Sequence, residues 1–496
     1  MRTRRGFVIA GLLAGMLMAG MDGTVVATAL PTIISDLGGL DLFVWVTSAY
    51  MVMMMASTPI FGKLSDMYGR KLFFMIGLAL FLAGSILCGM AGSMIQLIIY
   101  RGIQGIGGGA LMPIAFTIVA DLFPVEKRGK MMGIVGAIFG ISSIFGPLLG
   151  ALVTEAIGWR WVFFINLPIG LLSFLLTFLC YRESMERVKQ KIDGWGAVTL
   201  VLSVVALMLA LQLGGDVYAW ASPFIIGLFT LFAVFLTLFL WIENKTADPI
   251  LSFDMFKDRL FASSCAAALF VGAAYISAIT YIPMFVQGVF GGSATQAGYI
   301  LTPMMLGSVF GSQAGGFLTT KLSYKQIMLL ASAFFVPGIL LLSTLDVETA
   351  RYWVTIYMAL TGFGAGFSFS VLSMAAMHNF DYRRRGSASA TNRFAINLGM
   401  TLGITVFGIV QRTGFERELA VPVAGGQVSQ VDPRTLLNPE GRDQFSGEAL
   451  HQVISAFSSS ITLTFVVALV PAVLFLLSVT QMSHERAQTT QEPSDS

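Results

Sequence analysis

Two ionisable residues lie deep inside apolar stretches of this sequence. Asp22 stands about two thirds of the way along the apolar run 7–30, and Arg101 stands seven residues into the run 94–120. A charged side chain at the centre of a bilayer costs roughly 2.5–3.5 kcal/mol, so such residues are usually retained for work on ions or substrates. The two residues therefore point to transport across a membrane.

The same two residues are predicted to lie at one depth in the membrane. At a rise of about 1.5 Å per residue, Arg101 lies roughly 10 Å and Asp22 roughly 12 Å from the same surface. Opposite charges at one level should pair or share a hydrated cavity, because either alone would be costly. We predict that Asp22 binds the driving proton, or a cationic substrate in competition with it, and that Arg101 tunes its protonation and takes part in the proton relay. The alternative is a fixed ion pair that locks two helices together.

The composition is that of an integral membrane protein. Of 496 residues, 56% are hydrophobic and only 11% are charged, and the mean hydropathy is +0.79. Fourteen apolar runs recur along the chain, most of them about as long as a helix that crosses roughly 30 Å of hydrocarbon. They cover residues 7–30, 43–61, 72–91, 94–120, 131–157, 161–179, 197–213, 219–242, 260–286, 294–318, 327–345, 352–377, 387–410 and 454–482.

Several other classes of protein are disfavoured. The first run is too long for a signal peptide and lacks a clear cleavage site, so we expect it to stay attached. The cysteines, Cys88, Cys180 and Cys265, are odd in number and lie inside predicted spans, which indicates apolar packing rather than a metal site or disulfides. The sequence contains no HExxH, nucleophile elbow or phosphate-binding loop, so we expect neither an enzyme nor a cofactor.

The basic residues predict the orientation of the chain. If the N-terminus is cytoplasmic, 22 of the 30 Lys and Arg residues fall in inner segments and six in outer segments. By the positive-inside rule both termini then face the cytoplasm, in the cell inner (plasma) membrane. The net charge of +3 follows from this topology, and no nucleic-acid partner is expected.

An internal repeat divides the chain into two similar units. Glycines 105, 107 and 109 match glycines 362, 364 and 366 at an offset of 257, as do Phe123, Arg128 and Gly129 with Phe380, Arg385 and Gly386. At an offset of 254, Gly62 and Lys71 match Gly316 and Lys325. We predict a six-helix bundle over 1–184, two additional helices over 185–250, a second six-helix bundle over 251–486 with a long external loop at 413–452, and a disordered tail at 487–496.

The repeat does not extend to the two buried charges. The position that matches Arg101 holds Met358, and the position that matches Asp22 holds Ile276. The second unit therefore keeps the packing glycines without the charges. This asymmetry indicates that Asp22 and Arg101 serve function rather than folding.

Four motifs carry a resemblance to a known family. Residues 62–71 (GKLSDMYGRK) resemble the signature between spans 2 and 3 of the major facilitator superfamily. Together with residues 21–31 (MDGTVVATALP), 140–150 (GISSIFGPLLG) and 159–170 (WRWVFFINLPIG), they resemble its fourteen-span drug:proton antiporter branch. The resemblance covers essentially the whole chain. It implies an all-α membrane fold in which two six-helix bundles alternate access to a central site.

The resemblance assigns a gate to the loop between spans 2 and 3. Asp66 with Arg70 and Lys71 is predicted to form an ionic latch at the cytoplasmic side, and Gly62 and Gly69 allow tight turns and close approach. Similar proteins use this loop to stabilise one face of the transport cycle. The alternative is that Arg70 and Lys71 only anchor the helices at the membrane surface.

The fifth span carries a second motif. Small residues three or four apart, among them Gly140, Gly146 and Gly150, let helix backbones touch, and Pro147 is expected to bend the helix. In similar antiporters this motif seals the interface between the two halves. Ordinary helix packing is the alternative explanation.

The substrate cavity is less clearly marked. Soft or adaptable side chains that suit polyspecific binding are Met18, Tyr50, Gln104, Tyr275, Tyr281 and Gln287. Arg393 either extends to the membrane surface or has a function, Glu155 is interfacial or contacts a departing cation, and His378 is expected to be structural.

The sequence thus predicts a proton-driven exporter of hydrophobic, cationic or amphipathic drugs that works as a monomer. A dedicated exporter of one natural product or lipid is the nearest alternative, and for a neutral or anionic substrate Arg101 would make the direct contact. A membrane sensor without transport activity is the alternative of a different class.

Overall fold

The computed structural model describes residues 5–38, 42–183, 193–215, 217–246, 249–250, 252–292, 294–419 and 447–486. Over these residues the chain is built from α-helices, as predicted. The first unit contains α1 (Arg5–Leu37), α2 (Phe43–Tyr68), α3 (Arg70–Gly89), α4 (Met94–Leu122), α5 (Val125–Ile157), α6 (Arg160–Phe164) and α7 (Asn166–Cys180). The two additional helices are α8 (Gly194–Leu213) and α9 (Pro223–Glu243).

The second unit follows a short 3-10 helix, η2 (Phe253–Lys257). It contains α10 (Arg259–Gly288), α11 (Ala294–Leu318), α12 (Tyr324–Leu342), α13 (Arg351–Ala376), α14 (Arg385–Leu419) and α16 (Gly447–Thr480). Several helices begin at a polar residue whose side chain accepts a hydrogen bond from the first turn, as a helix start requires. Ser93, Ser222, Asp258 and Ser323 do this for α4, α9, α10 and α12.

Each predicted apolar run corresponds to a helix or a helix pair. Twelve of the described helical segments are long and apolar enough to cross a membrane, and they make this a multi-pass membrane protein. The 26-residue α2 and the 25-residue α11 lie alongside them but are not among the twelve, so the count of fourteen spans stays a prediction.

The predicted run 161–179 corresponds to one membrane-length segment, Arg160–Cys180, in which the single residue Ile165 separates α6 from α7. One predicted boundary was wrong. The external loop is shorter than the predicted 413–452, since residues 413–419 continue α14 and residues 447–452 already belong to α16. The part of that loop at 420–446 and the predicted tail at 487–496 lie outside the described residues.

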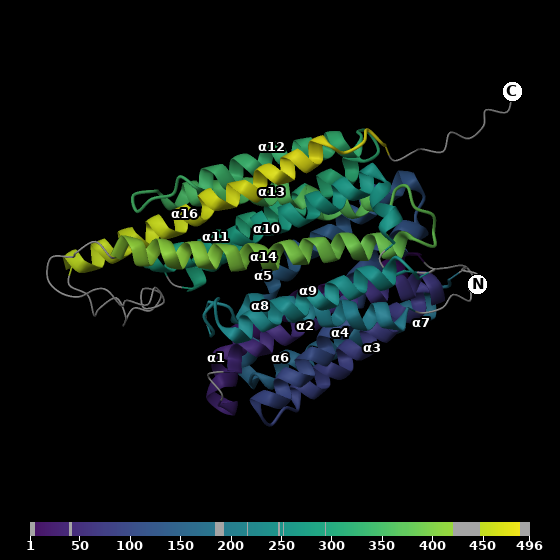
Figure 1. Cartoon of the computed structure of the whole chain (residues 1–496), viewed down its shortest axis with the longest axis horizontal. Coiled ribbons are helices and arrows are strands. Elements are labelled where there is room, and N and C mark those ends of the chain that lie inside the picture. Colours follow the sequence, from purple (N-terminus) through teal and green to yellow (C-terminus); the bar gives the residue numbers. More distant parts are fainter. Residues whose placement is uncertain are drawn as a thin grey trace.

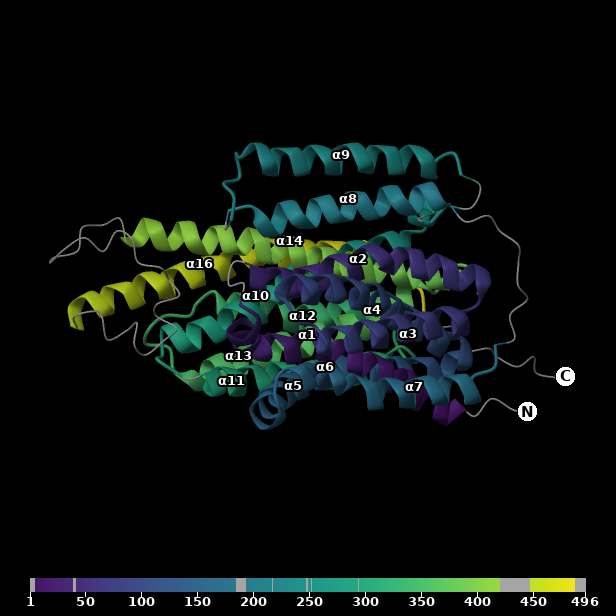
Figure 2. The same ribbon diagram turned by 90° about the horizontal axis from the view of Figure 1, so that it is seen from below.

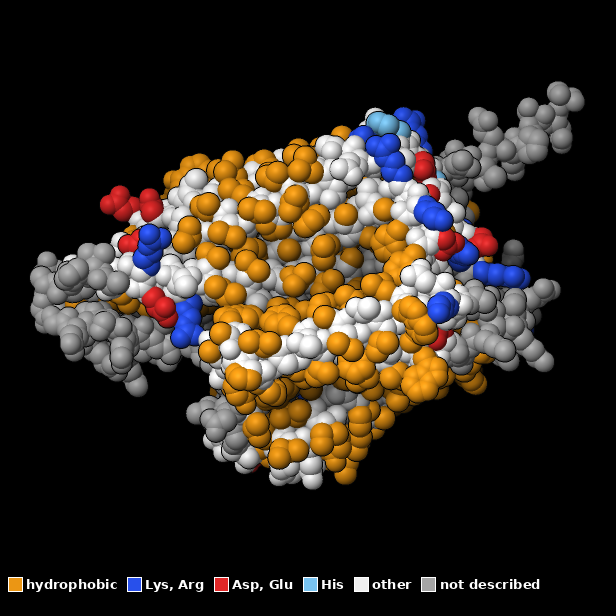
Figure 3. Space-filling view, in the orientation of Figure 1, with side chains coloured by type: hydrophobic (Ala, Val, Ile, Leu, Met, Phe, Trp, Pro, Cys, Tyr) orange, Lys and Arg blue, Asp and Glu red, His pale blue; other side chains and the backbone are white. Residues whose placement is uncertain are grey.

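The two units form two bundles that pack side by side, and both chain termini emerge at the same end (Figure 1). We call this the terminal end and the other the distal end. Figure 2 shows α8 and α9 on one flank of the molecule; α8 packs against α2 and α14, and α9 packs against α8. The face in Figure 3 is a broad apolar belt with charged side chains gathered at its two ends, as a membrane-embedded surface requires.

The repeat seen in the sequence is confirmed by matching contacts. A Cβ on Gly105 of α4 would meet the carbonyl of Tyr50, and a Cβ on Gly362 of α13 would meet the carbonyl of Met304. Tyr50 and Met304 differ by 254, and the glycines differ by 257. The next pairs also match, because Gly107 and Gly364 face backbone at Phe81 and Phe335, and Gly109 and Gly366 face backbone at Met54 and Ser308.

The bundles touch along two equivalent helix pairs, α2 with α14 and α5 with α11. Glycines make both contacts close. Gly62 lies against the backbone of Gly386 in the first pair, and Gly129 lies against the backbone of Gly316 in the second. These four residues are related by the same two offsets, so the interface repeats as the bundles do.

Candidate functional site

The predicted pair of charges is formed in the core of the first bundle. Arg101 Nη1 of α4 lies 2.5 Å from Asp22 Oδ2 of α1, and the two side chains are 0% and 1% exposed. Asp22 Oδ1 accepts two further hydrogen bonds, from Gln104 Nε2 at 2.8 Å and from Asn166 Nδ2 at 3.0 Å. The carboxylate thus receives three N–H donors, an arrangement that suits its ionised form.

Arg101 is held from the neighbouring helix as well as by the carboxylate. Its Nε donates to the carbonyl of Val46 at 3.1 Å, and its guanidinium carbon lies 4.2 Å from the centre of the Tyr50 ring, both on α2. Nη1 also donates to Gln104 Oε1 at 2.6 Å. The cation therefore joins α1, α2 and α4.

Two members of this network were not predicted as site residues. Ser85 of α3 accepts hydrogen bonds from Gln104 at 3.3 Å and Asn166 at 3.0 Å, and donates to the Phe163 carbonyl at 2.9 Å. Phe163 lies near the end of α6, and Asn166 is the first residue of α7. Asn166 belongs to the family motif at residues 159–170. A polar amide inside an apolar run is the sequence signal that could have assigned it to the Asp22 network.

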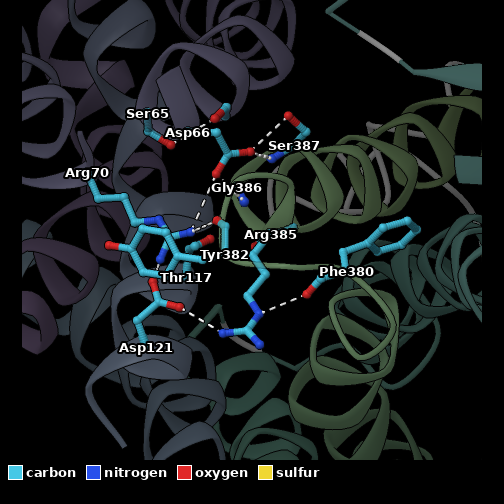
Figure 4. Close-up of polar contacts among 12 residues, drawn as sticks. Ser65, Asp66, Arg70, Thr117, Asp121, Phe380, Tyr382, Arg385, Gly386 and Ser387 are labelled. Carbon is cyan, nitrogen blue, oxygen red and sulfur yellow. Dashed lines mark hydrogen bonds and ion pairs between the residues drawn. The ribbon is translucent and has the colours of Figure 1, made fainter. Parts of the chain in front are cut away.

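The predicted gate crosses the interface between the bundles at the terminal end (Figure 4). Asp66 of α2 is 4% exposed and accepts from the backbone N–H of Gly386 at 2.8 Å, the N–H of Ser387 at 2.7 Å and the Ser387 hydroxyl at 3.0 Å. Gly386 and Ser387 form the first turn of α14, whose N–H groups and dipole favour a negative charge. Asp66 thus binds the start of a helix in the other bundle.

Arg70 connects this contact to a second acid. It lies 3.5 Å from Asp66, stacks at 3.8 Å on the Tyr382 ring, and pairs with Asp121 at the end of α4. Asp121 also pairs across the interface with Arg385 at 3.0 Å, as Figure 4 shows. Asp121 and Arg385 were not predicted as gate residues, although the repeat had already aligned Arg385 with Arg128.

Lys71 does not join the latch, so that part of the prediction was wrong. Its ammonium donates to the carbonyls of Phe178 at 2.7 Å and Tyr181 at 2.6 Å, at the end of α7. In return Glu183 accepts from the backbone N–H of Arg70 at 2.6 Å, at the start of α3. Lys71 therefore caps the C-terminal end of α7, and Glu183 caps the N-terminal end of α3. Together they hold the gate loop against α7.

The glycines of the gate loop behave as expected. Gly69 has φ of 111°, a conformation that other residues rarely adopt, and it forms the turn between α2 and α3. A Cβ on Gly62 would overlap Ala390 and the Gly386 carbonyl, so only glycine allows this approach of the two bundles.

The motif on α5 divides into two parts. Gly140 lies against Met305, Ser308 and Val309 of α11, at the interface between the bundles, as predicted. Gly146 and Gly150 instead lie against α1 near Thr24 and Thr28, within the first bundle. That part of the predicted seal was wrong. Pro147 lies inside the continuous helix α5, with its ring exposed.

The six predicted cavity residues are distributed over both bundles. Gln104 belongs to the Asp22 network, Tyr50 stacks on Arg101, and Met18 is buried in the core of the first bundle. The other three residues lie on α10 of the second bundle. Tyr275 and Tyr281 are buried there, and the side chain of Gln287 donates a hydrogen bond to the Pro283 carbonyl. A cavity of about 520 Å³ opens elsewhere, at the distal end between α14, α16 and the α12–α13 turn.

The remaining ionisable residues lie as follows. Glu155 is exposed near the end of α5, and Arg393 is half-buried on α14. His378 lies just beyond α13 at the terminal end, 3.2 Å from the Tyr324 hydroxyl and 3.7 Å from Glu485. Burial lowers the pKa of His378, and the charge of Glu485 partly opposes this change.

Comparison with known proteins agrees with this architecture. A sequence profile of the Major Facilitator Superfamily matches residues 12–404. The chain belongs to this superfamily. It is 52% identical to Multidrug resistance protein 3 of Bacillus subtilis (strain 168), over 98% of this chain and 96% of the relative. It is 37% identical to the multidrug transporter protein MdtP of the same organism, over 93% and 87%.

A solved structure confirms the fold independently. The crystal structure of the human organic anion transporter MFSD10 (TETRAN) superposes with a TM-score of 0.63, covering 97% of this chain and 100% of that one. The two sequences are only 16% identical, so this likeness concerns the fold alone. Like its relatives in the superfamily, the protein is a membrane transporter of small molecules rather than an enzyme.

Proposed function

We propose that the protein is a proton-coupled antiporter that exports hydrophobic, cationic or amphipathic drugs. The observation that carries the proposal is the buried Asp22–Arg101 pair, in a chain whose relatives at 52% and 37% identity are named multidrug proteins. In this proposal the protein lies in the inner (plasma) membrane of the cell. Its terminal end faces the cytoplasm. The bias of Lys and Arg toward segments on that side supports this orientation.

The contacts of Asp22 suggest how a proton acts. Three donors hold the carboxylate in this conformation, and Arg101 is one of them. A proton on Asp22 removes the charge that Arg101 pairs with, so protonation favours a conformation in which the guanidinium finds another partner. A cationic drug competes for the same negative charge. This competition couples inward proton movement, which supplies about 2.3 kcal/mol per charge per 100 mV, to outward drug movement.

The contacts of the gate indicate which conformation of the transport cycle this structure represents. Asp66 and Asp121 bind the start of α14 from the first bundle, and both contacts close the terminal end. Opening toward the cytoplasm separates α2 from α14 and breaks them. We therefore assign the present conformation to the half of the cycle that is closed to the cytoplasm.

Dye transport into inverted membrane vesicles tests the proposal. Energised vesicles that contain the protein are expected to accumulate ethidium, and an uncoupler is expected to abolish the accumulation. A panel of further cationic, neutral and anionic compounds defines the specificity. Accumulation that persists with the uncoupler would contradict proton coupling, and the lack of transport of every compound would favour a sensor. Transport of one compound alone would favour a dedicated exporter.

A further inference from the structure

Two polar atoms of the Asp22 network are buried with no hydrogen bond to any described residue. They are the hydroxyl of Tyr50 and Nη2 of Arg101. Tyr50 is 4% exposed and Arg101 is 0% exposed, so bulk water does not reach them in this conformation. A buried polar group without a partner is unfavourable and rare in native proteins, and an ordered water molecule usually serves as the partner.

The two atoms belong to one small region. The guanidinium of Arg101 stacks on the ring whose far edge carries the hydroxyl, with 4.2 Å between the guanidinium carbon and the ring centre. The other nitrogens of Arg101 are used, since Nε donates to Val46 and Nη1 to Asp22 and Gln104. Nη2 therefore is the part of this cation that remains available to a ligand.

The fold makes room for the hydroxyl. It lies only 2.8 Å from where a Cβ on Gly108 would stand, so a larger residue at this position of α4 would press on it. In the second bundle the matching residues are Met304 for Tyr50 and Ala365 for Gly108, which together offer neither a hydroxyl nor a glycine. The arrangement is thus specific to the bundle that holds the charges.

The hydroxyl also lies within electrostatic range of a cation on the second bundle. Tyr50 lies on α2, which packs against α14, and Arg393 of α14 lies within electrostatic range of the phenol. The charged groups that act on it among the described residues are Asp22 and Arg101 from its own bundle and Arg393 from the other, and the thiol of Cys88 lies near Asp22 and Arg101. Separation of α2 from α14 would withdraw Arg393 and bring the hydroxyl next to the space that opens.

We propose that the Tyr50 hydroxyl and Arg101 Nη2 share a bound water molecule, and that protons pass through this water between the inter-bundle space and Asp22. This proposal rests on the proposed function. The step is a simple transfer: a hydronium ion at the water position gives its proton to the Asp22 carboxylate, leaving a neutral water and a neutral carboxylic acid. Arg101 stays protonated throughout, and Tyr50 is a positioning residue that keeps its own proton.

The variant Tyr50→Phe tests the proposal, because it keeps the ring that stacks on Arg101 and removes only the hydroxyl. In proteoliposomes, ethidium transport driven by a pH gradient is expected to fall about five-fold, the effect of losing one hydrogen bond. Exchange of ethidium for ethidium without a gradient needs no proton step, so it is expected to stay within about two-fold of wild type. Tyr299→Phe, on the exposed surface of α11, is the matched control and is expected to change neither rate.

The outcomes separate this proposal from the proposed function. Equal losses of driven transport and exchange in Tyr50→Phe would show a structural role and overturn the water route, as would no loss in either assay. If Asp22→Asn loses driven transport while Tyr50→Phe does not, only the water route is wrong. If wild-type protein moves no ethidium or Asp22→Asn retains driven transport, the proposed function fails first. A map at about 2 Å resolution that shows water between the two atoms would support the proposal directly.

Discussion

The two bundles share their packing and differ in their chemistry. In the first, Asp22, Arg101 and Gln104 form a buried ionic network with Ser85. The matching residues of the second are apolar or uncharged: Ile276, Met358, Thr361 and Ile339. The glycines that bring α4 and α13 against their neighbours are the same in both. The packing of the second bundle is thus achieved with the glycines and without the charges, which supports the proposal that the charges of the first bundle serve transport.

The gate shows the same contrast at the bundle interface. Asp66 binds the start of α14, whereas the matching residue of the other helix pair is Thr320, whose hydroxyl donates to its own helix at Phe317. Close glycine contacts occur in both pairs. One interface is thus held by packing alone at this position, and the other by packing and charge.

Replacing the charged pair by its counterparts from the second bundle should have the largest effect. Arg101→Met leaves the Asp22 carboxylate buried without its cation, which is expected to cost about 3–5 kcal/mol of stability. The double variant Asp22→Ile with Arg101→Met removes both charges, so it is expected to unfold at a higher temperature than Arg101→Met and still to lack proton-driven transport. Thermal unfolding in detergent and vesicle transport measure the two properties. Full proton-driven transport by the double variant would show that the Asp22–Arg101 pair serves only to hold the helices together.

Packing, in contrast, should respond alike in the two bundles. Gly105→Ala and Gly362→Ala each place a Cβ against a backbone carbonyl of the neighbouring helix, that of Tyr50 and that of Met304. Overpacking of this kind costs about 1–3 kcal/mol, and we expect similar falls in unfolding temperature for both variants. A large effect in one bundle with none in the other would contradict the equivalence of the two packing patterns.

The gate should respond in one helix pair only. Asp66→Asn weakens the contact with the first turn of α14 by about 1–2 kcal/mol, so the open conformation should gain roughly ten-fold in population. Spin labels at Leu72 and Lys321, one on each bundle, would report this as a shift to longer distances. Thr320→Val is the control at the matching position, and a shift of the same size there would remove the proposed asymmetry.

His378 should give the smallest effect, and it depends on pH. Burial lowers its pKa, so the neutral ring is the form that the folded protein prefers. The fold is therefore fully stable above the ordinary pKa of 6.5 and weakens below it, as the ring gains a charge near Arg128 and Arg385 while Glu485 partly compensates. Thermal unfolding in detergent should show a small downward shift in unfolding temperature between pH 7.5 and pH 5.5 that His378→Gln removes. An unchanged shift in that variant would assign the pH response to another group.

Much of the architecture could be predicted because it depends on local sequence patterns. Apolar runs gave the helices, and the offsets of 257 and 254 gave contacts that the structure repeats at Gly105 and Gly362. Depth along a helix was enough to pair Asp22 with Arg101. Each of these predictions needs only regular helix geometry.

The contacts that could not be predicted are made between segments that are separate in the sequence and meet only in the folded protein. Glu183 reaches the start of α3 from beyond α7, and this contact also explains why Lys71 turns away from Asp66. Asn166 is the first residue of α7, and its contacts with Asp22 and Ser85 join segments far apart in the sequence, which local spacing does not define. The facing direction of Gly146 and Gly150 depends on the rotation of α5 about its axis, which spacing alone does not define.

Proton release on drug binding would show whether Asp22 carries the driving proton. Purified protein in weakly buffered detergent should release protons when ethidium is added, and a pH-sensitive dye would record them over a series of starting pH values. We expect release by wild type and none by Asp22→Asn, with ethidium still bound at higher concentration. Equal release by both proteins would contradict the assignment of the driving proton to Asp22.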